Sequence, residues 1–157
     1  MSVTVRAAEP RDLPAISELA GQLVRQHYGF DAQRFMLIPN AEAGYAHYFA
    51  GELSNPDTII LAAELEGAVV GYAYARMEAR DWNALLDACG ALHDIFVSER
   101  VRRQGVARSL VEAVRERLRA KGAPRLVLHT ASKNHAGREF FTALGFRDTM
   151  IEMTCEL

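Results

Sequence analysis

The chain has 157 residues, of which 50% are hydrophobic and 24% are charged, a composition ordinary for one soluble globular domain. Its 18 basic and 20 acidic residues leave a formal net charge of -2, which argues against a nucleic-acid or an anionic-membrane partner. No apolar run reaches the ~18 residues of a membrane-spanning helix, and the first residues lack a secretory apolar stretch. We therefore expect a cytoplasmic protein with a single domain over residues 1–157.

The first half of the chain predicts a strand, two helices and a β-hairpin, in that order. These elements are expected over 3–5, 12–29, 41–53, 59–65 and 68–77. After Asp12, a residue type that often caps helices, apolar residues recur at the spacing of an amphipathic helix. The two apolar runs of the hairpin flank Glu66 and Gly67, and glycine accepts the positive φ of a tight turn.

The second half predicts strands that alternate with helices. The expected elements are a polar connection over 78–90, a strand over 91–97, a helix over 105–121, a buried strand over 125–130, a helix over 134–144 and a final strand over 151–157. The final run alternates between apolar and polar residues, which indicates a half-buried strand. Antiparallel hairpins followed by a β-α-β unit predict an α/β domain with a mixed sheet.

The junction between the strand at 91–97 and the following helix carries the most informative pattern. A helix N-terminus offers unpaired N–H groups and a partial positive charge, and the small residues Gly105 and Ala107 let an anion approach closely. Three arginines add positive charge around this point: Arg102, Arg103 and Arg108. The pattern predicts a phosphate site best suited to a pyrophosphate, with a solvated basic helix start as the alternative. The P-loop and dinucleotide-binding patterns are absent from the sequence.

Two motifs of the chain resemble those of the GNAT family of N-acetyltransferases. The first, Arg102-Arg103-Gln104-Gly105-Val106-Ala107, matches the family signature Arg/Gln-x-x-Gly-x-Gly/Ala. The second, Asn134-x-x-Gly137-x-x-Phe140-Phe141 followed by Gly145-Phe146, is similar to the family pattern Asn-x-x-Ala-x-x-Phe-Tyr and Gly-Phe. The order of elements agrees over nearly the whole chain. The resemblance implies an α/β fold with a single GNAT-like domain, in which a mixed, mostly antiparallel sheet contains a splayed parallel strand pair and is flanked by helices.

The same resemblance implies acetyl-CoA as the cofactor and assigns residues to it. The pantetheine arm is expected between the strands at 91–98 and 125–130, and the pyrophosphate on the loop and helix start. Asn134 is expected to touch the pantetheine arm, with a helix cap as the alternative, and Phe141 to lie near the sulfur. The full set of expected contacts is Ile95, Phe96, Val97, Arg102, Arg103, Gln104, Gly105, Val106, Ala107, Arg108, Asn134 and Phe141.

The chemistry requires a base, because an alkyl ammonium has a pKa near 10.4 and must lose a proton before it attacks. His93 is the candidate, since similar enzymes place a glutamate there and histidine exchanges protons near neutral pH; the alternative is a half-buried structural histidine. Strand alternation places Asp94 on the opposite face unless a bulge intervenes, and Asp94 either binds a cationic substrate or braces a loop. Phe141 stands where the family often has a tyrosine acid. Water can take the place of this tyrosine as the acid that protonates the leaving thiolate. The alternative function is that of a sensor that binds acetyl-CoA with little turnover.

The expected function is acetyl transfer to a primary amine of a small molecule or of a peptide. In such proteins the segment after the first helix and the connection before the central strand bind substrate. Tyr28, Tyr45 and Trp82 are therefore candidate contacts to a cationic amine, with core or dimer packing as the alternative. A toxin that acetylates charged tRNA would need a basic face, which the net charge does not support. The sequence leaves open whether the protein forms a homodimer. No bound metal is expected, because three histidines do not have the spacing of metal ligands: His27, His47 and His129.

Overall fold

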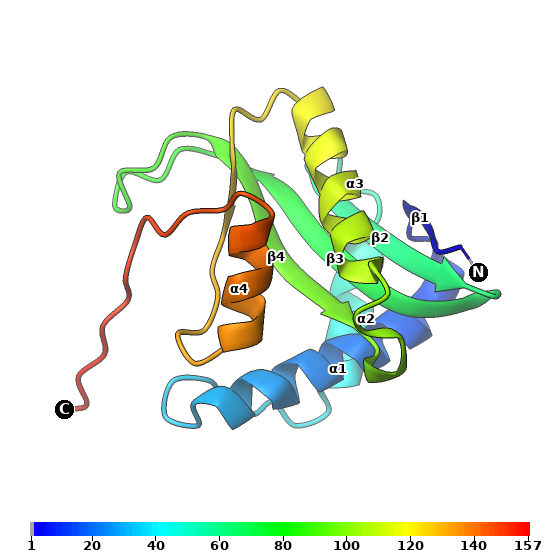
Figure 1. Cartoon of the computed structure of the whole chain (residues 1–157), viewed down its shortest axis with the longest axis horizontal. Coiled ribbons are helices and arrows are strands. Elements are labelled where there is room, and N and C mark those ends of the chain that lie inside the picture. Colours follow the sequence, from blue (N-terminus) through cyan, green and yellow to red (C-terminus); the bar gives the residue numbers. More distant parts are fainter. Residues whose placement is uncertain (1) are drawn as a thin grey trace.

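The computed structural model describes residues 2–157, and a five-stranded sheet lies at its centre (Figure 1). The strands are β1 (Thr4–Ala7), β2 (Thr58–Leu65), β3 (Ala68–Glu78), β4 (Cys89–Val97) and β5 (Leu126–Leu128). The helices are α1 (Leu13–Phe30), α2 (Ala41–Glu52), α3 (Val106–Ala120) and α4 (His135–Ala143), with short 3-10 turns η1 (Pro10–Asp12) and η2 (Glu99–Val101). Apart from the final strand, the predicted elements form within a few residues of their expected bounds.

The sheet runs in the order β1-β2-β3-β4-β5. Neighbouring strands are antiparallel from β1 to β4, whereas β4 and β5 are parallel. The β2–β3 hairpin turns at Glu66 and Gly67, whose φ angles of 52° and 79° show why a glycine is placed there. The mixed, mostly antiparallel sheet that the sequence predicts is therefore confirmed.

Helices cover both faces of this sheet and bury a core on each side. On one face, α3 packs a stripe of five buried side chains against the strands: Val106, Leu110, Val111, Val114 and Leu118. On the other face, α1 and α2 enclose a second core, in which Ile16 and Phe49 lie with Tyr72 of β3. Each fully buried apolar side chain stabilises the fold by about 1.5–3 kcal/mol relative to exposure. The two cores hold β3 and β4 rigidly between the helix layers.

The parallel pair β4–β5 is joined over a short stretch and then separates. Only Gly90, Ala91 and Leu92 of β4 pair with β5, although β4 continues to Val97. Over residues 93–97, the edge of β4 that faces β5 has no strand partner within the described part of the chain. The splayed strand pair implied by the family resemblance is confirmed.

The predicted final strand over 151–157 is wrong. Residues 146–157 form neither helix nor strand, and the segment leads away from the body of the molecule beyond α4 (Figure 1). The alternation is present in the sequence, but a strand also needs a neighbour to receive its backbone hydrogen bonds. From residue 150 on, the large apolar side chains are all exposed: Met150, Ile151, Met153 and Leu157.

Candidate active site

Beyond Leu92, the edge of β4 that faces β5 is unpaired among residues 2–157, and the space between the two diverging strands is here called the cleft. Ile95, Phe96 and Val97 pair on their other edge with β3, opposite Ala73, Tyr72 and Gly71. This pairing fixes their backbone, while the edge toward β5 is left without a strand. Backbone N–H and C=O groups demand hydrogen-bonding partners, so an extended chain with amide groups complements this edge.

The loop that follows β4 leaves the start of α3 open to an anion. Gly105 occupies the N-cap with a φ of 81°, and among residues 2–157 no side chain caps this helix. A Cβ built on Gly105 meets no atom within 4 Å, so the space over the helix start is empty of other side chains. Arg103 and Arg108 are exposed beside it. Free N–H groups, the helix dipole and two arginines together fit a phosphate.

Arg102 lies apart from these two arginines. Its guanidinium stands over the ring of Phe96 at 5.3 Å, and its Nε donates to the carbonyl oxygen of Val97 at 3.3 Å. It also pairs with Glu99 at 3.6 Å. Arg102 therefore holds the end of β4 in place and lines a separate cavity between α1 and β4.

On the far side of the cleft, Asn134 and Phe141 belong to α4. Asn134 caps the helix, because its Oδ1 accepts the Gly137 N–H at 3.0 Å, a role that is compatible with the expected contact to the pantetheine arm. Phe141 stacks edge-to-face on Phe140 and Phe146, with ring centroids 5.1 Å and 5.6 Å away. Their contacts with a cofactor stay predictions.

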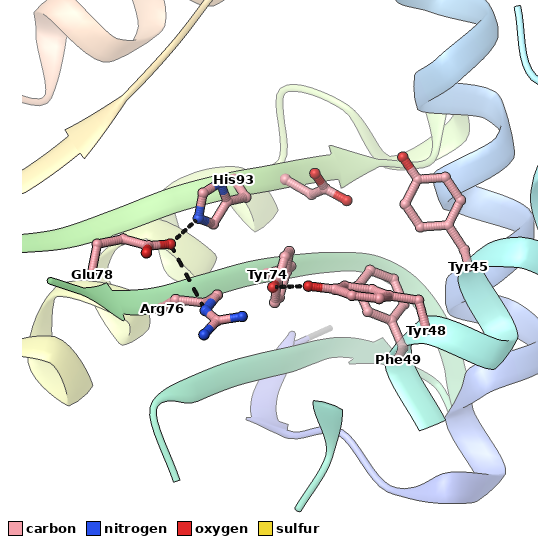
Figure 2. Close-up of a pocket in the computed structure, with 8 residues that line it drawn as sticks. Tyr45, Tyr48, Phe49, Tyr74, Arg76, Glu78 and His93 are labelled. Carbon is pink, nitrogen blue, oxygen red and sulfur yellow. Dashed lines mark hydrogen bonds and ion pairs between the residues drawn. The ribbon is translucent and has the colours of Figure 1, made fainter. Parts of the chain in front are cut away.

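A cavity of about 350 Å³ opens beside the splay, between α2 and the strands β3 and β4 (Figure 2). It is lined by four aromatic rings and four polar side chains: Tyr45, Tyr48, Phe49, Tyr74, Arg76, Glu78, His93 and Asp94. Two of the predicted site residues, His93 and Asp94, thus meet in one pocket with Tyr45. Aromatic faces combined with carboxylates are suited to binding a cationic amine.

A β-bulge brings His93 and Asp94 to the same face of the sheet. Opposite them, Tyr74 pairs with Asp94 and the next residue, Ala75, pairs with Leu92, so His93 is the extra residue of β4. The expectation from simple alternation, that Asp94 faces away from His93, is therefore wrong. The structure contains the bulge that the sequence analysis allowed as an exception to this alternation.

His93 is oriented by a carboxylate that sequence reasoning missed. Its Nε2 lies 2.7 Å from Oε1 of Glu78, the last residue of β3, and its ring stacks on Tyr74 at 5.4 Å. An Nε2–H that donates to Glu78 leaves the lone pair on Nδ1 free to accept a proton. The His93 side chain is 42% exposed and lines the pocket. The Glu78 carboxylate and the His93 imidazole form a pair of the kind that general base catalysis uses, and the pair lies at an open pocket.

Asp94 is half-buried and lines the pocket. Burial raises the pKa of Asp94, and the Tyr72 hydroxyl, which donates to it at 3.0 Å, offsets part of this effect. Burial and the nearby Asp94 likewise raise the pKa of Tyr45 to about 12, so this phenol keeps its proton at neutral pH. The half-buried carboxyl lacks a cationic side-chain partner at hydrogen-bonding distance among residues 2–157, and a substrate ammonium would supply that charge.

The raised pKa of Asp94 predicts a pH-dependent cost to stability. The folded protein holds this proton more tightly than the unfolded chain does, so stability falls as pH rises above the ordinary Asp value of about 3.9. Asp94→Asn removes the titration, and we expect its melting temperature to exceed that of wild type at pH 7. The difference should shrink toward pH 3, which melting curves at both pH values would show. A variant less stable than wild type at pH 7 would contradict this account.

Arg76 is the cation of the pocket and is already paired. Its NH1 lies 3.3 Å from Glu52 and its Nε 3.8 Å from Glu78. The Thr58 hydroxyl, and secondarily Arg76, lower the pKa of Glu52, which therefore stays ionised. The Nε of Arg76 is buried and has no hydrogen-bond acceptor among residues 2–157. With Glu52, Glu78 and Asp94 around one arginine, the pocket favours positive charge.

The aromatic side chains that line the pocket, here called the aromatic wall, differ in part from the candidate substrate contacts predicted from the sequence. Tyr45 lines the pocket, whereas Tyr28 and Trp82 lie outside it. Trp82 is 74% exposed in the connection between β3 and β4, where Arg80 stands over its ring at 5.1 Å. Tyr48 and Tyr74 complete the wall instead, with their hydroxyls 2.7 Å apart.

Among residues 2–157, no group of three or more His, Cys, Asp and Glu side chains is arranged to hold a metal ion. None of the helices there has the length and apolar character needed to span a bilayer.

A splayed strand pair, an open helix start and a pocket with an oriented histidine are the features that the family resemblance implies for an acetyltransferase. A family model described as the acetyltransferase (GNAT) family matches residues 24–146, which is most of the chain. The protein therefore belongs to the GNAT family of acetyltransferases, and it is an N-acetyltransferase.

Individual relatives agree with this placement. A D-amino-acid N-acetyltransferase of Saccharomyces cerevisiae is 25% identical over 146 residues, covering 92% of this chain and 85% of that protein. An L-methionine sulfoximine/L-methionine sulfone acetyltransferase of Pseudomonas aeruginosa is 27% identical over 147 residues, covering 93% and 81%. The aminoglycoside N-acetyltransferase AAC(6')-Iy, solved in complex with coenzyme A, has the same fold, with a TM-score of 0.81, 22% identity and coverage of 99% and 95%.

Proposed function

We propose that the protein transfers an acetyl group from acetyl-CoA to a primary amine of a small molecule that carries a second positive charge. The observation that carries this proposal is the pocket in which the His93–Glu78 pair adjoins Asp94 and three tyrosines. The relatives named above act on amino acids or on aminoglycosides, according to their names, and all of these are small amines. A cytoplasmic location stays a prediction of the sequence.

The residues at the cleft fit acetyl-CoA. The open edge of β4 at Ile95–Val97 would pair with the amide-containing pantetheine arm, and the uncapped start of α3 with Arg103 and Arg108 would hold the pyrophosphate. Because a side chain at position 105 would enter this space, glycine keeps the approach open. Acetyl-CoA supplies the thioester carbonyl that the amine attacks, with the thiolate of coenzyme A as the leaving group.

His93 and the end of β4 then have separate tasks. The Nδ1 of His93 accepts the proton of the incoming ammonium, while Glu78 holds the ring in place through Nε2 and stabilises the imidazolium. A backbone N–H of residues 95–97, fixed by pairing with β3, donates to the oxygen that becomes negative during attack. Phe141 provides no hydroxyl, so the coenzyme A sulfur leaves as an unprotonated thiolate, which costs about 2 kcal/mol at neutral pH for a thiol of pKa about 8.5; the thiolate then takes its proton from water.

The charge of the pocket indicates which amines are bound. The reacting amine must be neutral when it attacks, so it does not compensate the carboxylates. Asp94 therefore remains for a second ammonium on the same molecule, held among the rings of Tyr45 and Tyr48. A substrate carboxylate would meet Arg76, whose charge Glu52 and Glu78 already neutralise. Diamines, polyamines and amino sugars with several amines fit this pocket better than α-amino acids do.

An amine panel with detection of the released thiol tests this proposal. We expect kcat/KM for diamines, polyamines and aminoglycosides to exceed that for zwitterionic amino acids by about tenfold or more, which is ~1.4 kcal/mol. If zwitterionic amino acids are the best substrates, the proposal that Asp94 binds a second ammonium of the substrate is overturned. Bound acetyl-CoA without turnover of any amine in the panel would instead favour the sensor.

A further inference from the structure

Tyr72 places a hydroxyl group inside the protein, in contact with a side chain of the pocket. It lies in the middle of β3 and is fully buried in the core that α1 and α2 cover. Its ring packs edge-to-face on Phe49 of α2, with the ring centroids 6.0 Å apart. Burying a hydroxyl without a hydrogen-bond partner is costly, so a buried tyrosine usually has one. The partner of Tyr72 is Asp94, whose Oδ2 accepts a hydrogen bond from this hydroxyl at 3.0 Å.

The strand register connects this buried hydroxyl to the pocket. Tyr72 pairs with Phe96 of β4, so Asp94, two residues before Phe96, is its diagonal neighbour on the same face of the sheet. Asp94 lines the pocket, whereas Tyr72 does not. One carboxylate thus both borders the pocket and is hydrogen-bonded to the core.

The hydrogen bond from Tyr72 favours the ionised form of Asp94. A carboxylate is a stronger acceptor than a protonated carboxyl group, so a donor at this distance stabilises the charged state. Burial acts in the opposite direction and raises the pKa of Asp94, and the Tyr72 hydroxyl is the largest influence that lowers it. Without this hydroxyl, Asp94 would therefore become neutral at a higher pH.

The other titratable and charged groups around Asp94 come from α1, α2, β3 and β4: His27, Tyr45, Tyr48, Tyr74, Arg76, Glu78 and His93. The two histidines lower the pKa of Asp94 through their charge alone, and less than Tyr72 does. Tyr45 and Asp94 influence each other through charge and are not hydrogen-bonded. Among residues 2–157, Tyr72 is thus the side chain that donates a hydrogen bond to this carboxylate.

We propose that Tyr72 is a positioning residue for substrate choice: its buried hydroxyl holds Asp94 as the ionised partner of the substrate's second ammonium. This inference rests on the proposed function, in which that ammonium binds Asp94. Tyr72 touches neither the amine nor acetyl-CoA and acts through Asp94 only. It extends the preference for doubly charged amines to pH values at which Asp94 would otherwise be protonated and would no longer attract a cation.

The pH dependence of this preference tests the proposal. The preference is the ratio of kcat/KM for putrescine to kcat/KM for butylamine, a monoamine of the same chain length. The effect of pH on His93 cancels in this ratio, because both amines react at the same site. The ratio should fall as pH decreases and Asp94 is protonated. We expect the midpoint of this fall to lie higher in Tyr72→Phe than in wild type by about one pH unit, which is ~1.4 kcal/mol. Curves that coincide between about pH 5 and 8 would overturn the proposal.

Two variants serve as controls. Tyr45→Phe removes a nearby hydroxyl that is not hydrogen-bonded to Asp94, so its midpoint should equal that of wild type. A rise as large as that of Tyr72→Phe would show that the hydrogen bond is not the cause, against the proposal. Asp94→Asn has no carboxylate and should show no fall of the ratio with pH. If Asp94→Asn keeps the full preference for putrescine, the assignment of Asp94 in the proposed function fails together with this inference.

A titration without substrate separates the two failures further. ¹³C NMR of labelled aspartate carboxyl groups follows the protonation of Asp94 directly, and the signal missing in Asp94→Asn identifies it. Its midpoint should rise in Tyr72→Phe by the same amount as the midpoint of the preference. A midpoint that rises in the NMR titration while the preference curve does not move would overturn the role of Tyr72 in substrate choice, and would leave acetyl transfer itself untouched.

Discussion

Replacing His93 by alanine is expected to lower kcat by about 10²–10⁴-fold, the usual contribution of a general base. The reason is that Nδ1 of His93 is the free basic nitrogen of the pocket, oriented by Glu78 at 2.7 Å from Nε2. The dissociation constant of acetyl-CoA should change little, because the proposed cofactor contacts are the backbone of residues 95–97 and the start of α3, and not the His93 side chain. Thiol release under saturating amine measures the first quantity, and a titration monitored by intrinsic fluorescence measures the second.

Two further variants make the His93 result specific. His47→Ala removes an exposed histidine of α2 that does not line the pocket, and its kcat should equal that of wild type. Glu78→Gln keeps a hydrogen-bond acceptor for His93 but loses the charge, so its kcat should fall less than that of His93→Ala. In both His93→Ala and Glu78→Gln, the loss should diminish at high pH, where hydroxide deprotonates the amine. An unchanged kcat in His93→Ala would remove His93 from the mechanism.

Gly105→Ala is expected to raise the dissociation constant of acetyl-CoA by about 10–100-fold. The added Cβ projects into the open space at the N-cap of α3, beside the proposed phosphate site, and each lost hydrogen bond to a charged group costs about 1.5–3 kcal/mol. Calorimetric titration of acetyl-CoA, or of coenzyme A alone, gives the constant directly.

Gly67→Ala is the matched control for this variant. Gly67 has a φ of 79° against 81° for Gly105, and an added Cβ meets no atom within 4 Å at either position. Both substitutions therefore introduce a similar backbone strain, of about 1–2 kcal/mol, but Gly67 lies in the β2–β3 turn. Equal weakening of acetyl-CoA binding by the two variants would show that strain, and not the open helix start, explains the effect.

Local patterns predicted the elements that surround the site. The stripe from Val106 to Leu118 marked α3 because helical spacing and a buried face coincide there. The glycine at position 67 marked the hairpin, because a tight turn needs its positive φ. These features depend on neighbours in sequence, and the structure reproduces them.

What sequence reasoning missed depends on pairing between distant segments. The bulge at His93 exists only in the register of β4 against β3, and it both places Asp94 in the pocket and brings Glu78 to His93. Glu78 carries a weak signal in hindsight, since it is an acidic residue at the pocket end of a predicted hairpin. The final strand was predicted from true alternation, but no strand of the same chain lies beside residues 151–157.

The most direct test of this account is the melting temperature of wild type with and without about 1 mM acetyl-CoA. A ligand at 100 times its dissociation constant adds about 2.7 kcal/mol, which raises the melting temperature of a domain of this size by several degrees. We predict such a rise, and its reduction in Gly105→Ala but not in Gly67→Ala. No rise at this concentration would contradict the assignment of the cleft between β4 and β5, and with it the proposed acetyl transfer.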